Sequence, residues 1–163
     1  MEPVDEPSWV ELVRGDGWRL VEPARDPYWA QAEGRVPCRE VDFGEEYGGV
    51  ELSTSYCGYI TLSQALLHAV HEGELLELSA WHSPLISAEP AEGLIALGLG
   101  GDTLWSRRLV IPAEAESWTV ELRLERGIEA GEPVLFHVSN HGANSYTFYR
   151  LRVARSPVAA RVD

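Results

Sequence analysis

The feature that most constrains the fold is a two-residue alternation of apolar and polar side chains that recurs from residue 49 onward. In residues 118–124, for example, Trp, Val, Leu and Leu alternate with Thr, Glu and Arg. Such alternation is typical of a β-strand with one buried face. Runs of this kind return at regular spacing, separated by glycine, proline and asparagine, which favour turns. The pattern predicts an all-β protein: an antiparallel β-sandwich, jelly-roll-like, of about eight strands.

One segment breaks the alternation and predicts a single short helix over residues 63–72. Ser63 can cap a helix, Leu66 and Val70 are four residues apart, and Gly73 can end a helix. Elsewhere the chain lacks the strand–helix rhythm of a parallel sheet. The sequence Gly-Gly-Asp at 100–102, between two strand-like runs, predicts a β-hairpin.

The first 48 residues are rich in proline, glycine and glutamate. Two short alternating runs, 9–13 and 18–22, flank a glycine-rich turn and predict a hairpin. Residues 23–48 read as a loop. We therefore expect an N-terminal hairpin and loop over 1–48 that wraps the core, the β-sandwich over 49–155, and a tail over 156–163, with no internal domain boundary.

Charge excludes several classes of function. The formal net charge is −13, with 26 acidic residues against 13 arginines and no lysine. Such a chain repels phosphates, which argues against nucleic acid and anionic membranes as partners. The absence of lysine excludes Schiff-base chemistry. No apolar run approaches the ~18 residues of a membrane span, and the first residues lack the basic and apolar regions of a secretory leader.

The two cysteines, Cys38 and Cys57, lie 19 positions apart. A disulfide between them would stabilise the fold by roughly 3 kcal/mol in the chain-entropy model. The alternative is a pair of reduced, half-buried thiols. We favour the disulfide, and with it an oxidising compartment, extracellular or periplasmic.

Residues 133–153 read as two strands joined at a polar corner that contains Asn140, His141 and Asn144. Asparagine and glycine close turns, which by itself explains much of the corner. Alternatively, amides bond sugar hydroxyls while aromatic rings stack on a pyranose. The candidate ligand-binding residues are then Trp81, Asn140, Asn144, Tyr146 and Tyr149. Alternation points Trp81 away from the core, whereas Tyr149 shares parity with apolar positions 151 and 153 and so also fits the core.

Three histidines form a second candidate set. His137 and His141 bracket the corner, and His82 ends a strand from which it can reach the same end of the sandwich. Three converging imidazoles would bind zinc or copper. The alternative is a buried polar network in which His82 and Asn140 satisfy loop backbone groups.

Sharp catalytic signatures are absent from the sequence. It contains no G-x-S-x-G, H-E-x-x-H, C-x-x-C or Walker motif. The abundance of carboxylates leaves a glycosidase-type pair open but makes any particular pair uninformative. Catalysis therefore stays undecided, and a non-catalytic chain is the favoured interpretation.

Residues 118–153, above all the run from Gly127 through the Asn-His-Gly-Ala-Asn corner to Val153, resemble the closing hairpin of galactose-binding-like jelly-roll modules of the carbohydrate-binding type. The resemblance is one of spacing more than identity. It implies a non-catalytic carbohydrate-binding module of the kind appended to secreted enzymes. It also implies a ligand-bonding role for Asn144 and a structural calcium. The Asn-His-Gly insertion departs from the pattern.

Three functional hypotheses follow from these observations. The first is a secreted β-sandwich that binds a glycan or a protein surface through residues 137–149 and Trp81. The second is a metal-binding β-sandwich that uses His82, His137 and His141. The third is a structural or assembly protein without a small ligand. The sequence does not decide the oligomeric state.

Overall fold

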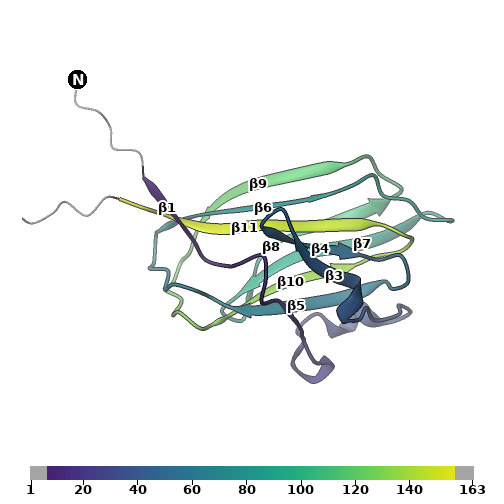
Figure 1. Cartoon of the computed structure of the whole chain (residues 1–163), viewed down its shortest axis with the longest axis horizontal. Coiled ribbons are helices and arrows are strands. Elements are labelled where there is room, and N and C mark those ends of the chain that lie inside the picture. Colours follow the sequence, from purple (N-terminus) through teal and green to yellow (C-terminus); the bar gives the residue numbers. More distant parts are fainter. Residues whose placement is uncertain (1–6, 157–163) are drawn as a thin grey trace, which may run out of the picture.

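The computed structural model describes residues 7–156, which form a sandwich of two antiparallel β-sheets (Figure 1). Helical residues in this part of the chain are confined to three short 3-10 turns: η1 (Pro23–Arg25), η2 (Trp29–Ala32) and η3 (Glu40–Asp42). No helix among these residues is long and apolar enough to cross a membrane. The strands, in chain order, are β1 (Ser8–Glu11), β2 (Arg19–Leu20), β3 (Phe43–Glu46), β4 (Gly49–Ser53), β5 (Tyr59–Ala65), β6 (Leu75–His82), β7 (Ala91–Leu99), β8 (Asp102–Ile111), β9 (Glu116–Arg123), β10 (Pro133–Ser139) and β11 (Ser145–Arg155).

The strand order confirms the predicted jelly-roll-like sandwich. One sheet has the order β3-β4-β11-β6-β9, with β1 also paired to β11, and the other has the order β2-β5-β10-β7-β8. Every pairing between these strands is antiparallel. The chain crosses between sheets at most of its turns, so strands distant in sequence lie side by side. The exceptions are β3 to β4 and β7 to β8, and the second of these is the hairpin predicted around residues 100–102.

The hydrophobic core lies between the two sheets. Phe136 of β10 and Phe148 of β11 meet there with ring centroids 5.2 Å apart. Both side chains are almost fully buried, and each such burial stabilises the fold by about 1.5–3 kcal/mol. The two-residue alternation of apolar side chains gives each strand one apolar face, and that face lies in this core. The alternation therefore predicts two sheets packed face to face.

The helix predicted over residues 63–72 is wrong. Strand β5 continues to Ala65, and a loop follows. Leu66 and Val70 are both buried, but as two separate anchors of this loop. The Leu66 N–H donates to Glu132 O at 2.8 Å, and Val70 exchanges backbone hydrogen bonds with Ile128 at 2.8 and 2.9 Å. The four-residue spacing of Leu66 and Val70 therefore arises from two separate contacts with the loop at 128–132 and does not mark one face of a helix.

The hairpin predicted from runs 9–13 and 18–22 is also wrong, because the two runs enter different sheets. Strand β1 pairs with β11, and β2 pairs with β5. The same holds for the corner at 140–144, which carries the chain from β10 in the five-stranded sheet to β11 in the six-stranded sheet. In both places the turn chemistry was recognised, but a turn can join two sheets as readily as two paired strands.

Residues 22–38, here called the strap, cross the outer face of the five-stranded sheet, where Figure 1 shows the 3-10 turns η1 and η2 beside β5. The Tyr28 ring stacks on His137 of β10, with centroids 4.6 Å apart. The Trp29 ring meets Tyr59 of β5 edge-on at 5.4 Å. The Cys38–Cys57 disulfide, present as predicted, ties the end of the strap to the loop before β5. The domain limits at 48 and 155 stay predictions, and residues 157–163 of the expected tail lie outside the described part.

Candidate functional site

The polar corner is built around two buried asparagines. Asn140 and Asn144 are 0% and 5% exposed. The Asn140 amide donates to Thr54 Oγ1 at 2.7 Å and to Gly142 O at 2.7 Å. Asn144 Oδ1 accepts from the Ile86 N–H at 2.7 Å, and its amide nitrogen faces three oxygens at 2.9–3.0 Å. These bonds hold together the loops that follow β4, β6 and β10.

Tyr146, the next predicted ligand residue, belongs to the same network. Its side chain is fully buried, and its hydroxyl donates to Asn140 Oδ1. Burial raises the pKa of the Tyr146 phenol well above its usual range. The amide and hydroxyl groups of Asn140, Asn144 and Tyr146 therefore already have partners inside the protein. Ligand bonding by these three residues stays a prediction, while their structural role is visible.

Trp81 and Tyr149 lie together on the outer face of the six-stranded sheet. Their ring centroids are 5.4 Å apart, with planes inclined at 43°. Both side chains are partly exposed. Trp81 alternates with the core residues of β6, as the sequence predicted. The Arg150 guanidinium lies over the Tyr149 ring, 4.7 Å from its centroid.

Tyr149 reaches this face because β11 contains a β-bulge. The register against β6 shifts between Phe148 and Arg150, so Tyr149 has no direct partner there. The bulge reverses the alternation: Phe148 and Leu151 both face the core although their positions differ in parity. The core position considered for Tyr149 from its shared parity with Leu151 is therefore wrong. Gly49 of β4 permits the bulge, since a Cβ there would lie 2.8 Å from Tyr149 Cα.

Hydroxyl and carboxyl groups surround the aromatic pair. Thr147 lies in register between Trp81 and Glu51, and Ser117 lies on the other side of Trp81. A hydrogen bond with Glu46, together with burial, raises the pKa of the Glu51 carboxyl to about 7. At neutral pH this face thus offers both donors and acceptors beside an aromatic surface.

The three histidines proposed as metal ligands occupy different environments. His137 lies under the strap on the five-stranded sheet, beside Tyr28 and Thr61. His82 packs against Trp118 and Tyr146 of the six-stranded sheet, and its Nδ1 donates to Ser83 O at 2.7 Å. His141 is exposed at the corner. Among residues 7–156, potential ligand atoms gather within 4.8 Å at Cys38, Asp42 and Cys57, where the disulfide already joins the two sulfurs.

His137 is buried in a way that keeps its imidazole neutral. Desolvation, with a smaller contribution from the charge of Arg35, lowers its pKa to about 3, although a backbone hydrogen bond with Ile60 acts in the opposite direction. One ring nitrogen, Nδ1, lies 2.9 Å from Thr61 Oγ1. The other, Nε2, has no hydrogen-bond partner in the part of the chain that the structure describes.

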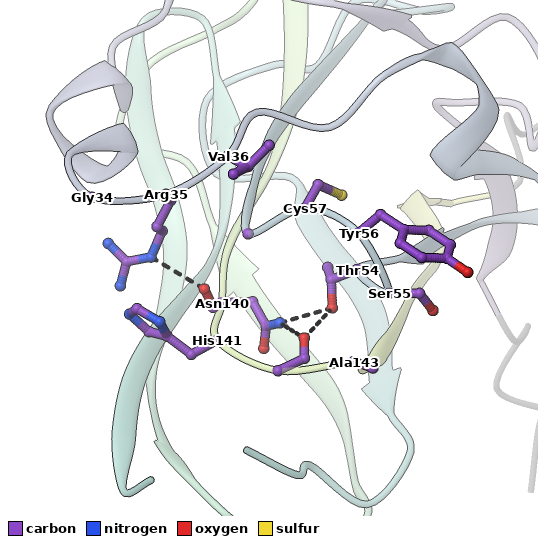
Figure 2. A pocket seen from close by; sticks show the side chains of 12 residues that line it. Gly34, Arg35, Val36, Thr54, Ser55, Tyr56, Cys57, Asn140, His141 and Ala143 are labelled. Atoms are coloured by element: carbon purple, nitrogen blue, oxygen red, sulfur yellow. Dashed lines mark hydrogen bonds between the residues drawn. The ribbon is translucent and has the colours of Figure 1, made fainter. Parts of the chain in front are cut away.

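A hollow of about 300 Å³, here called the rim pocket, opens where the strap meets the corner (Figure 2). Arg35 and His141 lie on one side of it, and Ser55 and Tyr56 lie on the opposite side. Its floor includes the buried Asn140 amide. The lining residues are Gly34, Arg35, Val36, Thr54, Ser55, Tyr56, Cys57, Gly58, Asn140, His141, Gly142 and Ala143.

Sequence reasoning missed two features of these surfaces. The bulge had a visible signal, because the apolar positions of residues 146–153 change parity after Phe148. Arg35 had no such signal in the sequence. A single arginine in a loop looks like any solvated arginine until the tertiary structure shows where the strap lies.

No protein-family model matches the chain, and no curated protein matches it. Solved structures of similar architecture include a CBM4 carbohydrate-binding module at 13% identity, with a TM-score of 0.47 over 86% of this chain and 96% of that chain. They also include a xylan-binding CBM15 module at 12% identity, with a TM-score of 0.45 over 94% and 99%. A third is CBM61 in complex with β-1,4-galactotriose, at 12% identity and a TM-score of 0.44 over 87% and 90%. These values describe a likeness of sandwich architecture, and no assignment of the site depends on them.

Proposed function

We propose that this protein is a carbohydrate-binding β-sandwich whose platform is the Trp81–Tyr149 pair on the outer face of the six-stranded sheet. The observation that supports this most is the pair itself: two partly exposed rings 5.4 Å apart on a face that also carries hydroxyl groups. An indole in such a position gains most from a ligand that covers it. Sugars combine an apolar ring face with a rim of hydroxyls, which suits this surface.

Trp81 would provide most of the stacking area. Arg150 already occupies one side of the Tyr149 ring, at 4.7 Å from its centroid. Tyr149 would then support the indole and extend the platform, while its hydroxyl remains available as a donor or acceptor. Stacking of a ring on an aromatic side chain contributes about 1–3 kcal/mol by alanine substitution in comparable nucleobase platforms.

The surroundings favour an extended neutral glycan. Ser117 flanks Trp81 in register and is exposed, so it can bond sugar hydroxyls, whereas Thr147 on the other side of Trp81 is buried. An open strand face accommodates a polysaccharide lying along it, whereas a small free metabolite would leave most of its own surface in water. Binding without catalysis is consistent with the absence of sharp catalytic motifs from the sequence.

An extracellular or periplasmic location forms part of the proposal. The Cys38–Cys57 disulfide supports it, because such bonds persist in oxidising compartments.

The test is affinity electrophoresis and calorimetry of the wild-type protein against a panel of soluble plant and bacterial polysaccharides. Trp81→Ala should weaken binding to the preferred polysaccharide at least tenfold, equivalent to about 1.4 kcal/mol. Tyr149→Phe should cost less, because the stacking area remains. Tyr47→Asn is the matched control, since Tyr47 is 82% exposed in the turn between β3 and β4 and its loss should leave affinity unchanged.

Two results would contradict the proposal. One is a polysaccharide that binds wild type and Trp81→Ala equally well while both variants keep the wild-type melting temperature. The other is a complete lack of binding across neutral polysaccharides at millimolar repeat-unit concentration.

A further inference from the structure

The rim pocket differs in charge from the rest of this acidic protein. None of its twelve lining residues carries a carboxylate. Three other hollows in the surface each contain at least one carboxylate, as expected for a chain with 26 acidic residues and 13 basic ones. One of the three, which includes Glu92 and Arg108, lies on the other side of Arg35 and shares this residue with the rim pocket. A concave site that excludes negative side chains while the surface is rich in them is suited to an anionic ligand.

Arg35 supplies the positive charge of this pocket and is held in place by neutral groups. Its Nε donates to Asn140 O at 3.3 Å, Nη1 to Gln31 O at 2.9 Å, and Nη2 to Glu92 O at 3.2 Å. All three acceptors are backbone carbonyls, drawn from the corner, the strap and β7. A guanidinium has five N–H donors, so two remain after these three bonds.

Within residues 7–156 no carboxylate lies within 4.0 Å of the Arg35 guanidinium, whereas seven other arginines form ion pairs at that cutoff. The side chain is partly buried, so its charge is less screened than that of a solvated arginine. The effect reaches His137, whose pKa the charge of Arg35 helps to lower. A fixed, partly buried cation without a counter-ion is a preorganised partner for a carboxylate.

The other walls of the pocket suit a sugar ring. His141 lies beside Arg35 with an exposed imidazole that can hydrogen-bond (Figure 2). Ser55 lies on the opposite side, where its hydroxyl contacts Ser53 Oγ at 3.1 Å. Val36 adds an apolar wall. A volume of about 300 Å³ is at the lower end of the range of small-ligand sites, which limits the occupant to one or two rings.

We propose that the rim pocket binds the carboxylate of an acidic sugar residue, such as a hexuronate, with Arg35 as the residue that recognises the acid group. The two remaining guanidinium N–H groups bond the carboxylate, and His141 bonds a ring hydroxyl. This site goes beyond the aromatic platform and shares no residue with it. Together they would let one molecule bind a neutral backbone and an acidic substituent of the same polysaccharide.

The test compares methyl β-glucuronide with methyl β-glucoside by calorimetry and saturation-transfer NMR on the full chain. Wild type should bind the glucuronide at least tenfold more tightly than the glucoside, and 0.5 M NaCl should weaken only the glucuronide. Arg35→Met should abolish the difference between the two sugars. Arg35→Lys should restore part of it, because charge returns without the planar fork.

Two controls separate recognition from the structure of the strap. Tyr28→Phe removes the 2.9 Å contact between the Tyr28 hydroxyl and Thr103 Oγ1 and disturbs the strap without touching the pocket, so glucuronide binding should persist. Trp81→Ala should also leave it intact, so this proposal can fail or succeed independently of the platform. Equal affinity for the two sugars, or wild-type glucuronide binding by a folded Arg35→Met protein, would overturn the inference. Selective binding of peptide C-terminal carboxylates over the glucuronide would overturn it as well.

Discussion

Replacing Asn144 with alanine tests whether the corner is held by its buried amide. Asn144 Oδ1 accepts one hydrogen bond, and Nδ2 lies within 3.0 Å of Ile86 O, Asn140 Oδ1 and His141 O. An amide nitrogen has two hydrogens, so three oxygens share two donors and the side chain makes three full bonds. At about 1 kcal/mol each, Asn144→Ala should destabilise the fold by about 3 kcal/mol.

Asn144→Asp sharpens this prediction. The new carboxylate would face the same three oxygens without a proton to donate, so at pH 7 it should cost at least as much as alanine. In acid the protonated carboxyl regains one donor, and the deficit should shrink.

Denaturant titration and calorimetry measure the free energy of unfolding of both variants. His141→Ala, an exposed position on the same corner, is the control and should stay within 0.5 kcal/mol of wild type. A loss of ~3 kcal/mol lowers the melting temperature by about 6–12 °C in a domain of this size. An Asn144→Ala protein within 0.5 kcal/mol of wild type would show that the network contributes nothing, and the reasoning would be refuted.

Two further predictions concern His137 and Gly49. Because the pKa of His137 is lowered to about 3 in the fold, its contribution to stability is complete above the unfolded pKa of ~6.5 and is lost as pH falls below it. The resulting loss in the free energy of unfolding should amount to about 2 kcal/mol between pH 7 and pH 5. His137→Phe should remove that part of the acid sensitivity in denaturant melts, and identical pH slopes for the two proteins would contradict it. Gly49→Ala places a Cβ 2.6 Å from Phe148 O, so it should cost about 1–3 kcal/mol and weaken polysaccharide binding by displacing Tyr149. Gly44→Ala, with nothing within 4 Å of its Cβ, should do neither, and equal behaviour of the two variants would argue against the bulge as the device that positions Tyr149.

Part of the candidate sites could be predicted from the pattern of residues along the chain. The outward position of Trp81 followed from alternation, and the disulfide followed from two cysteines in segments that could meet. The structure places the predicted ligand residues in two environments: Trp81 and Tyr149 lie on the outer face of the six-stranded sheet, whereas Asn140, Asn144 and Tyr146 are buried. The same residues were recognised as important, but they divide between an aromatic platform and a buried network.

What the sequence determined by itself is local: the period of two and the turns. These features depend on residues that are adjacent along the chain, so they can be read directly from the sequence. Tertiary structure alone decided that residues 140–144 join two sheets, that Leu66 and Val70 anchor a loop, and that Arg35 meets His141 beside a hollow. Each of these depends on which distant segments pair, and many pairings have nearly equal local preference. The choice among them comes from burying all apolar faces at once, which is a property of the whole sandwich.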